Sequence, residues 1–280
     1  MCEVGIDFKN INSYNLEMQK GMEDKLFFLN HLPKDQHYIF VDFGCADGAM
    51  INALSTILQN CKLNHYIGYD ISDTMINLAR TNYHGPVDAN VHFYTKWDEV
   101  KEFMNSMKDI WGNIRNYKFV LILSSVIHEV YSYGDVHSIH DFWDHTVNSD
   151  FDYIIVRDMC PSGDINREAS SDLVEAITSK RSVGIQLEQF QNKWGSILNN
   201  KNLIHFLLKY RWTVNWGREL NENYFPIYVN DLIENVKANY KIDYLERFRV
   251  PFLDECFKND FGIELNDYTH VKAIFSKLQK

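Results

Sequence analysis

Short runs rich in β-branched and aromatic residues alternate with amphipathic segments over the first 160 residues of the chain. The segments between the runs carry apolar residues at helical spacing, as helical crossovers between parallel strands require. One run, FVLIL, is apolar throughout and predicts a central strand that is buried on both faces. We therefore expect an α/β fold with a doubly wound, mostly parallel sheet. The runs are Tyr38–Asp42, Tyr66–Asp70, Val91–Tyr94, Phe119–Leu123 and Tyr153–Val156.

The two ends of the chain lie outside this alternation. Residues 11–32 have apolar side chains at helical spacing and predict an amphipathic helix, or a pair of helices, that ends at Pro33. Residues 240–253 and 268–277 show alternation typical of strands. The stretch between them, 254–266, predicts a helix or a loop.

A turn of small residues follows the first run. It reads DFGCADG and places Gly44, Ala46 and Gly48 at every second position after Asp42. A strand, a glycine-rich turn and a helix in this order present backbone N–H groups to a nucleotide-like ligand. Glycine is favoured because a side chain would keep the ligand away from the backbone, and because such a turn can require positive φ. An acid, Asp70, ends the second run, where it can accept hydrogen bonds from two ribose hydroxyls.

With these residues the chain resembles the class I S-adenosylmethionine (SAM)-dependent methyltransferases over residues 36–160. Their first motif is an acid followed by three alternate glycines, and Ala46 here replaces the middle one. The resemblance implies that Asp42 holds the methionine end of SAM through its ammonium group and that Asp70 holds the ribose. It also implies a seven-stranded sheet that the last two strands close as an antiparallel pair. The residues expected around the cofactor are Asp42, Gly44, Cys45, Ala46, Gly48, Asp70, Ile71, Met75, Trp97, Asp98, Ser124 and Ser125.

Three of these residues concern the adenine. The resemblance implies that Met75 packs against the adenine, that Trp97 stacks on it and that Asp98 accepts its amino hydrogens. Each has a structural alternative: Met75 as a helix residue that faces the sheet, and Trp97 or Asp98 as a cap of the following helix.

The competing interpretation of the turn is a nicotinamide dinucleotide site. A G-x-G-x-x-G pattern would fall on Gly44, Ala46 and Ala49, so two of its three glycines are absent. The acid at Asp42 also suits an ammonium group better than a pyrophosphate. The sequence therefore favours SAM over NAD.

Polar residues cluster after the fourth and fifth runs, at the sheet edge where ligands bind in such folds. His128 is either a base that deprotonates or orients the nucleophile, since its ordinary pKa is near neutral, or a structural residue that hydrogen-bonds at a helix start. The catalytic candidates are His128, Glu129, Tyr131 and Asp158.

The same segments argue against three other kinds of site. Amino-methyltransferases of DNA carry Asn or Asp, then Pro-Pro and an aromatic residue, where this chain has Ser124-Ser125-Val126-Ile127. Cys160 lacks the second cysteine that covalent cytosine-C5 RNA methyltransferases require. His137, His140 and His145 do not share one helical face, so we expect no metal.

The composition indicates a globular protein. Hydrophobic residues make up 45% and charged residues 24% of the chain, and the net charge of −10 disfavours unspecific binding to nucleic acid. Five scattered cysteines without a C-x-x-C motif predict reduced intracellular thiols. Neither a secretory signal nor an apolar run of membrane-spanning length is visible, so we expect a cytoplasmic protein with no membrane partner.

One segment reverses the overall charge. Residues 180–220 hold seven Lys or Arg against Glu188 and Glu219, a surplus of +5 in which several aromatic residues are interleaved. Such a segment can stack on bases and hold phosphates. The alternative, which the helical spacing favours, is a helical cap whose aromatic residues form its own small core.

These observations together predict a SAM-dependent methyltransferase that acts on a small molecule or a nucleic acid. A non-catalytic subunit that binds SAM or its demethylated product, S-adenosylhomocysteine (SAH), is the alternative. We expect a helical lid over 1–35, a SAM-binding core over 36–164, a helical insertion for substrate recognition over 165–240, and closing strands over 241–280.

Overall fold

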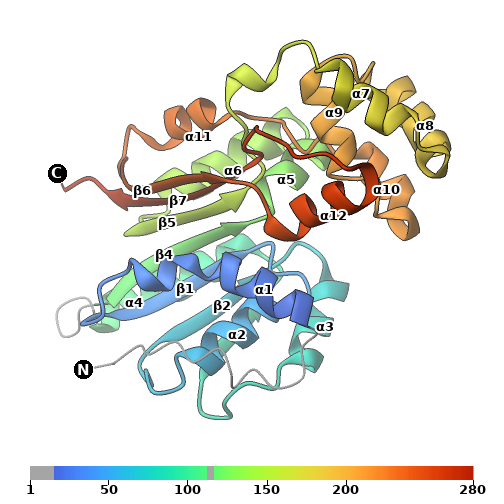
Figure 1. The fold of residues 1–280 in the computed structure, drawn as a ribbon. Helices are drawn as coiled ribbons and strands as arrows, with labels where there is room; N and C mark the ends of the chain where they lie inside the picture. Colours follow the sequence, from blue (N-terminus) through green and yellow to red (C-terminus); the bar gives the residue numbers. More distant parts are fainter. Residues whose placement is uncertain (1–15, 112–116, 280) are drawn as a thin grey trace.

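The computed structural model describes residues 16–111 and 117–279, which form one mixed sheet covered by helices (Figure 1). The strand order is β3-β2-β1-β4-β5-β7-β6, with β7 antiparallel to both of its neighbours and the other pairs parallel. The expected fold class is confirmed, including the antiparallel closing pair. The strands are β1 (His37–Phe43), β2 (His65–Tyr69), β3 (Asn90–Tyr94), β4 (Tyr117–Ser124), β5 (Tyr153–Asp158), β6 (Tyr240–Phe248) and β7 (His270–Lys277).

The strand order reverses between β1 and β4, and this switch point places the candidate residues. Both β2 and β4 pair in parallel with β1, and β5 pairs in parallel with β4. The carboxyl ends of these four strands therefore meet at one edge of the sheet, where they carry Phe43, Tyr69, Ser124 and Asp158. A crevice forms at such an edge because the crossovers leave in opposite directions.

Alternation along β1 divides the core into two layers. Ile39 and Val41 join one apolar cluster, whereas Tyr38 and Phe40 join the cluster on the other face, because successive side chains in a strand point to opposite faces. The helices α4 (Trp97–Trp111), α6 (Val136–Asn148) and α11 (Val229–Val236) contribute to the first cluster. The 3₁₀ helix η2 (Phe27–Asn30), α2 (Ala49–Ile57) and α3 (Asp73–Asn82) contribute to the second, and α1 (Leu16–Lys25) precedes η2.

A third cluster belongs to helices that gather beyond one end of the sheet (Figure 1, yellow to orange). Its residues come mainly from α7 to α10 and from α12, and they include the aromatic side chains of Phe190, Phe206, Tyr210 and Trp216. We call this part the helical cap. Its helices are α7 (Ser171–Thr178), α8 (Gly184–Trp194), α9 (Asn200–Leu207), α10 (Trp216–Asn221) and α12 (Pro251–Phe261), with the 3₁₀ helices η3 (Gly163–Ile165), η4 (Arg181–Val183) and η5 (Thr213–Asn215).

Two expectations need correction. The strand expected over 240–253 ends at Phe248, and α12 begins at Pro251, which fits the first turn of a helix but removes a donor from a strand. The thiols of Cys45, Cys160 and Cys256 are free and buried. Cys61, however, is disulfide-bonded, so the expectation of reduced thiols is wrong there. Among the described helices, none is long and apolar enough to cross a membrane.

Candidate functional site

The turn between β1 and α2 has a left-handed backbone at every second residue. The φ angles of Gly44, Ala46 and Gly48 are 74°, 46° and 79°, so the small residues stand where a larger side chain would strain the chain. The N–H groups of Gly44 and Cys45 donate to the Tyr69 carbonyl at 2.8 and 2.9 Å. These bonds fix the turn against the end of β2, and α2 begins directly after it.

Gly44 is also required by its surroundings. A Cβ at this position would lie 2.6 Å from Cγ2 of Val126, the residue that precedes helix α5 (Ile127–Tyr133). The backbone of the turn therefore lies directly against the start of α5. This contact links the predicted cofactor turn to the segment that carries the predicted base.

Asp70 lies beside the turn, as expected from its place after the second strand. Its Oδ2 accepts a hydrogen bond from the Ala46 N–H at 3.0 Å, and its Oδ1 accepts one from the Ser72 N–H at 2.9 Å. Each oxygen keeps a lone pair for a further donor. The carboxylate is thus held in place by the backbone and could still accept two ribose hydroxyls.

Asp42 is buried at the end of β1, with 4% of its surface exposed. Among the described residues, none donates a hydrogen bond to its carboxyl group. Burial raises its pKa to about 7, although the charge of Lys25 opposes this effect. An arriving ammonium group would be stabilised by this carboxylate and would lower its pKa in turn.

The residues expected near the adenine differ in their surroundings. Ile71 is 85% exposed and Met75 is 37% exposed, so Met75 does not pack into the sheet. Asp98 is exposed and pairs with Lys101 at 2.7 Å. The ring of Trp97 is buried in the core among Phe43, Tyr69 and Phe151 rather than lying open at the sheet edge. Its contact with adenine stays a prediction.

His128 and Asp158 form a buried pair that joins α5 to the end of β5. Nδ1 of His128 donates to Oδ1 of Asp158 at 2.8 Å, and Asp158 also accepts the N–H groups of Ile127 and Met159, each at 2.7 Å. Burial lowers the pKa of His128, but the Asp158 carboxylate outweighs burial and the pKa is raised. Burial likewise raises the pKa of Asp158, but His128 and the backbone donors leave that pKa lowered. A carboxylate on Nδ1 orients the ring and leaves Nε2 as the acceptor.

Glu222 is the residue at this site that the sequence did not single out. It is 3% exposed, and its Oε2 lies 4.0 Å from Nε2 of His128. Its Oε1 accepts from the hydroxyl of Tyr133 at 2.9 Å and from Nε of Arg218 at 2.7 Å. No local motif marks Glu222, because its meeting with His128 depends on how the helical cap docks on the sheet.

Of the other two catalytic candidates, Glu129 lies near this pair and Tyr131 does not. Glu129 accepts from Nη2 of Arg218 at 2.7 Å, and burial raises its pKa. Tyr131 points elsewhere: its hydroxyl accepts from Nε1 of Trp143 at 3.0 Å, and its ring packs on the core under α6.

The two serines at the end of β4 lie at the switch point: Ser124 is its last residue and Ser125 follows it. Ser125 has φ of 58°, and its hydroxyl accepts from Nη1 of Arg157 at 3.2 Å. The hydroxyl of Ser124 is buried and has no hydrogen-bond partner among the described residues. An unpaired buried hydroxyl at this edge is a further polar group that a ligand could satisfy.

Many of the basic side chains of segment 180–220 bind partners within the chain. Lys209 is fully buried; its Nζ donates to the carbonyls of Glu219 and Glu222 and lies 4.2 Å from the centroid of the Tyr224 ring. Burial lowers its pKa to about 7. Arg211 pairs with Asp260 at 3.2 Å. Most of the aromatic residues of this segment pack into the core of the helical cap, as the favoured alternative predicts.

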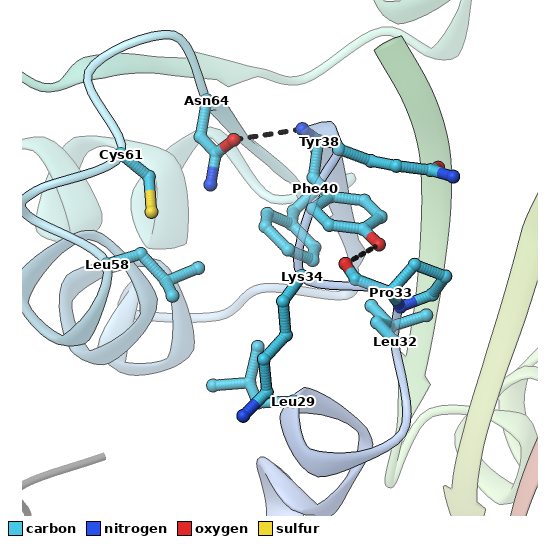
Figure 2. A pocket seen from close by; sticks show the side chains of 10 residues that line it. Leu29, Leu32, Pro33, Lys34, Tyr38, Phe40, Leu58, Cys61 and Asn64 are labelled. Carbon is cyan, nitrogen blue, oxygen red and sulfur yellow. Dashed lines mark hydrogen bonds between the residues drawn. The ribbon is translucent and has the colours of Figure 1, made fainter. Parts of the chain in front are cut away.

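A small pocket lies at the opposite end of β1, beside Tyr38 (Figure 2). Leu29, Leu32 and Leu58 contribute to its lining, and the Tyr38 hydroxyl donates to the Pro33 carbonyl at 2.5 Å. The cavity has a volume of about 20 Å³, enough for about one water. This pocket is separate from the candidate site at the carboxyl ends of the strands.

Comparison of the sequence with protein-family models and with curated proteins gives no match. Solved structures do match. The cyclopropane synthase MmaA2 from Mycobacterium tuberculosis has a TM-score of 0.50 at 8% identity, over 96% of this chain and 87% of that one. The small RNA methyltransferase HEN1 has a TM-score of 0.44 at 12% identity, over 95% of this chain, which spans 27% of HEN1. The plantazolicin methyltransferase BpumL, solved with SAH, has a TM-score of 0.38 at 12% identity, over 93% of this chain and 82% of BpumL.

The structural neighbours are thus SAM-dependent methyltransferases, all at low sequence identity. The likeness extends to the strand order, in which an antiparallel β7 lies between β5 and β6. This chain has the class I methyltransferase fold.

Proposed function

We propose that the chain is a SAM-dependent methyltransferase. The observation that carries the proposal is the turn at Gly44, Ala46 and Gly48, together with Asp70, whose carboxylate lies beside the Ala46 N–H. Backbone and carboxylate here form a surface that suits a ribose, and the buried Asp42 carboxylate nearby suits an ammonium group. SAM contains both groups.

In this proposal the chain supplies alignment and one proton acceptor. Bound SAM supplies an electrophilic methyl group, so catalysis consists of holding the acceptor in line, excluding water and removing a proton where the acceptor carries one. Nε2 of His128 is the proton acceptor, and Asp158 stabilises the imidazolium that forms. The Glu129 carboxylate, which influences the pKa of His128, lies near this position.

Experiments can distinguish this proposal from two alternative functions. A subunit that binds SAM or SAH without catalysis would keep Asp42, Gly44, Gly48 and Asp70, but would release no SAH with any acceptor. A nicotinamide-binding oxidoreductase would bind NAD at the same turn. The buried His128–Asp158 pair favours an enzyme, because a binding subunit needs no oriented base.

The test is a thermal-shift comparison of SAM, SAH and NAD with wild type and the Asp70→Ala variant. A ligand at about 100 times its Kd stabilises the fold by about 2.7 kcal/mol. In a chain of this size each kcal/mol raises the Tm by about 2–4 °C. We expect SAM and SAH to raise the Tm of the wild type and to lose this effect in Asp70→Ala. Asp73→Ala, which removes an exposed acid three residues later, serves as the control and should keep the shift. A shift with NAD alone would overturn the proposal.

A further inference from the structure

The site next to His128 contains an oxygen and a nitrogen that face each other without a hydrogen bond. Nδ1 of His128 is taken by Asp158, and Oε1 of Glu222 is taken by Tyr133 and Arg218. Among the described residues, none donates a hydrogen bond to, or accepts one from, Nε2 of His128, although 94% of this residue is buried. Oε2 of Glu222 lies 4.0 Å from Nε2 of His128, beyond hydrogen-bond distance.

The separation of these two atoms suits one further nitrogen. An atom about 2.8 Å from both would complete a triangle with an angle of about 90° at that atom, near the angle between two N–H bonds of an ammonium group. It would donate one hydrogen to the Glu222 carboxylate and one to Nε2 of His128. Buried polar atoms generally have such partners.

The charges around the gap favour a cation. Asp158, Glu129 and Glu222 are carboxylates that each influence the pKa of His128, and Arg218 is the cation bonded to two of them. Lys209 donates to main-chain carbonyls and not to the carboxyl groups. The carboxylates therefore exceed the cations at the gap, and a carboxylate or a phosphate placed there would be repelled.

The helical cap does not compensate with a surface suited to nucleic acid. Lys209 is buried, and Arg218 and Arg211 are paired with acids. Lys193 donates to Asn221 at 2.7 Å, and Lys201 donates to the Tyr228 hydroxyl at 3.3 Å. These side chains already have partners within the cap, which weakens the hypothesis of a phosphate-binding segment.

We propose that the methyl acceptor is a cationic amine whose nitrogen binds between Nε2 of His128 and Oε2 of Glu222. This inference rests on the proposed function. The amine enters as R–NH₃⁺ and transfers one proton to neutral His128, which becomes an imidazolium between Asp158 and Glu222. The freed nitrogen lone pair attacks the methyl carbon of SAM, and the C–S bond breaks with its electron pair going to sulfur. The products are R–NH₂–CH₃⁺, SAH and protonated His128, so charge and atoms balance.

The experiment measures acceptor binding to SAH-saturated protein by isothermal titration calorimetry. The probes are n-butylamine and spermidine, with 1-butanol and butyrate as matched neutral and anionic compounds, and a 20-nucleotide single-stranded RNA. We expect both amines to bind and the other probes to bind at least tenfold more weakly. Glu222→Gln should weaken amine binding at least tenfold, as the loss of a charge-assisted hydrogen bond implies. Glu175→Gln removes an exposed charge from α7 and should leave amine binding unchanged.

The outcomes separate the two proposals. Absence of SAH and SAM binding would overturn the proposed function. If SAH binds but the amines do not, or if butyrate or RNA binds in preference, only the amine inference fails. Equal amine affinity in the wild type and Glu222→Gln would also overturn the inference. SAH affinity that is unchanged in Glu222→Gln would show that the variant is folded and that the loss of amine binding is specific.

Discussion

Arg157 and Asp24 form an ion pair between residues 133 positions apart in the sequence. Nε and Nη2 of Arg157, at the end of β5, lie 2.9 and 2.8 Å from Oδ2 of Asp24 in α1. Lys272 of β7 lies 2.5 Å from the other carboxylate oxygen. With side chains 11% and 17% exposed, the pair fixes the last turn of α1 against the carboxyl end of β5, and it accounts for the place of Lys25 near Asp42.

Replacing this carboxylate should loosen α1. Asp24→Asn leaves Arg157 and Lys272 as neighbouring cations without their counter-ion, and we expect a loss of about 3 kcal/mol, the lower end for a broken buried pair. Hydrogen exchange of residues 21–30 should become faster than in wild type, and urea unfolding should show the loss. Glu23→Gln, at the exposed neighbour, is the control. Unchanged exchange in Asp24→Asn would mean that packing alone holds α1.

A methyl group at Gly44 should damage the turn. Gly44→Ala combines a left-handed backbone with a contact of 2.6 Å to Val126, and overpacking of this kind costs about 1–3 kcal/mol. The variant should also lose the Tm shift with SAM, because the turn must move away from α5. Gly163→Ala meets nothing within 4 Å and should stay within about 0.5 kcal/mol of wild type. Equal stability of the two variants in urea unfolding would contradict the proposed contact.

The pKa of His128 should be measurably raised by Asp158. In an NMR titration of the histidine ring protons, we expect the wild-type pKa above the ordinary value of about 6.5. We expect a lower pKa in Asp158→Asn, where burial is opposed only by the more weakly acting Glu129 and Glu222. Burial lowers the pKa of His145, which should be the same in both proteins and so serves as the internal control. The pair therefore adds its full share to the free energy of unfolding below pH 6.5, and this share is lost as the pH rises through the raised pKa of His128.

Lys209 should make the stability of the wild type rise with pH. Its pKa is about 7 in the folded chain and about 10.4 when unfolded, so between these values the unfolded state binds the additional proton. The free energy of unfolding of the wild type, minus that of Lys209→Met, should therefore increase between pH 7 and pH 10 by at most about 1.4 kcal/mol per unit. Lys180→Met, at an exposed position, should show no such trend. A flat difference for Lys209→Met would mean that the buried ammonium keeps its ordinary pKa.

The part of the site that could be predicted comprises the unit of β1, the following turn and α2, together with the end of β2. One stretch of seven residues holds Asp42, Gly44, Ala46 and Gly48. Its left-handed positions require small residues, and this requirement is visible in the local sequence. The predicted place of Asp70 follows because parallel strands end at the same edge. The strands were likewise predictable from apolar runs, since both faces of a central parallel strand are buried.

The surroundings of His128 could not be predicted in this way. Glu222 reaches His128 only because the helical cap docks on α5: the Asn223 N–H donates to the Ser132 hydroxyl at 2.8 Å, and that hydroxyl donates to the His128 carbonyl at 2.6 Å. Lys209 counts as a basic surface residue in any local pattern, yet it is buried. Contacts between distant segments depend on packing, which local patterns do not encode.

The sequence by itself therefore determined the fold class, the turn of small residues after β1 and the acids beside it, because the local backbone conformation and the burial of strands restrict which residues can stand there. Only the tertiary structure decided which side chains meet at His128, that Trp97 lies in the core, and that most of the named basic side chains of 180–220 bind partners within the chain. The physical reason is that a buried charge or an aromatic ring is placed by its whole surroundings, which several distant segments supply together.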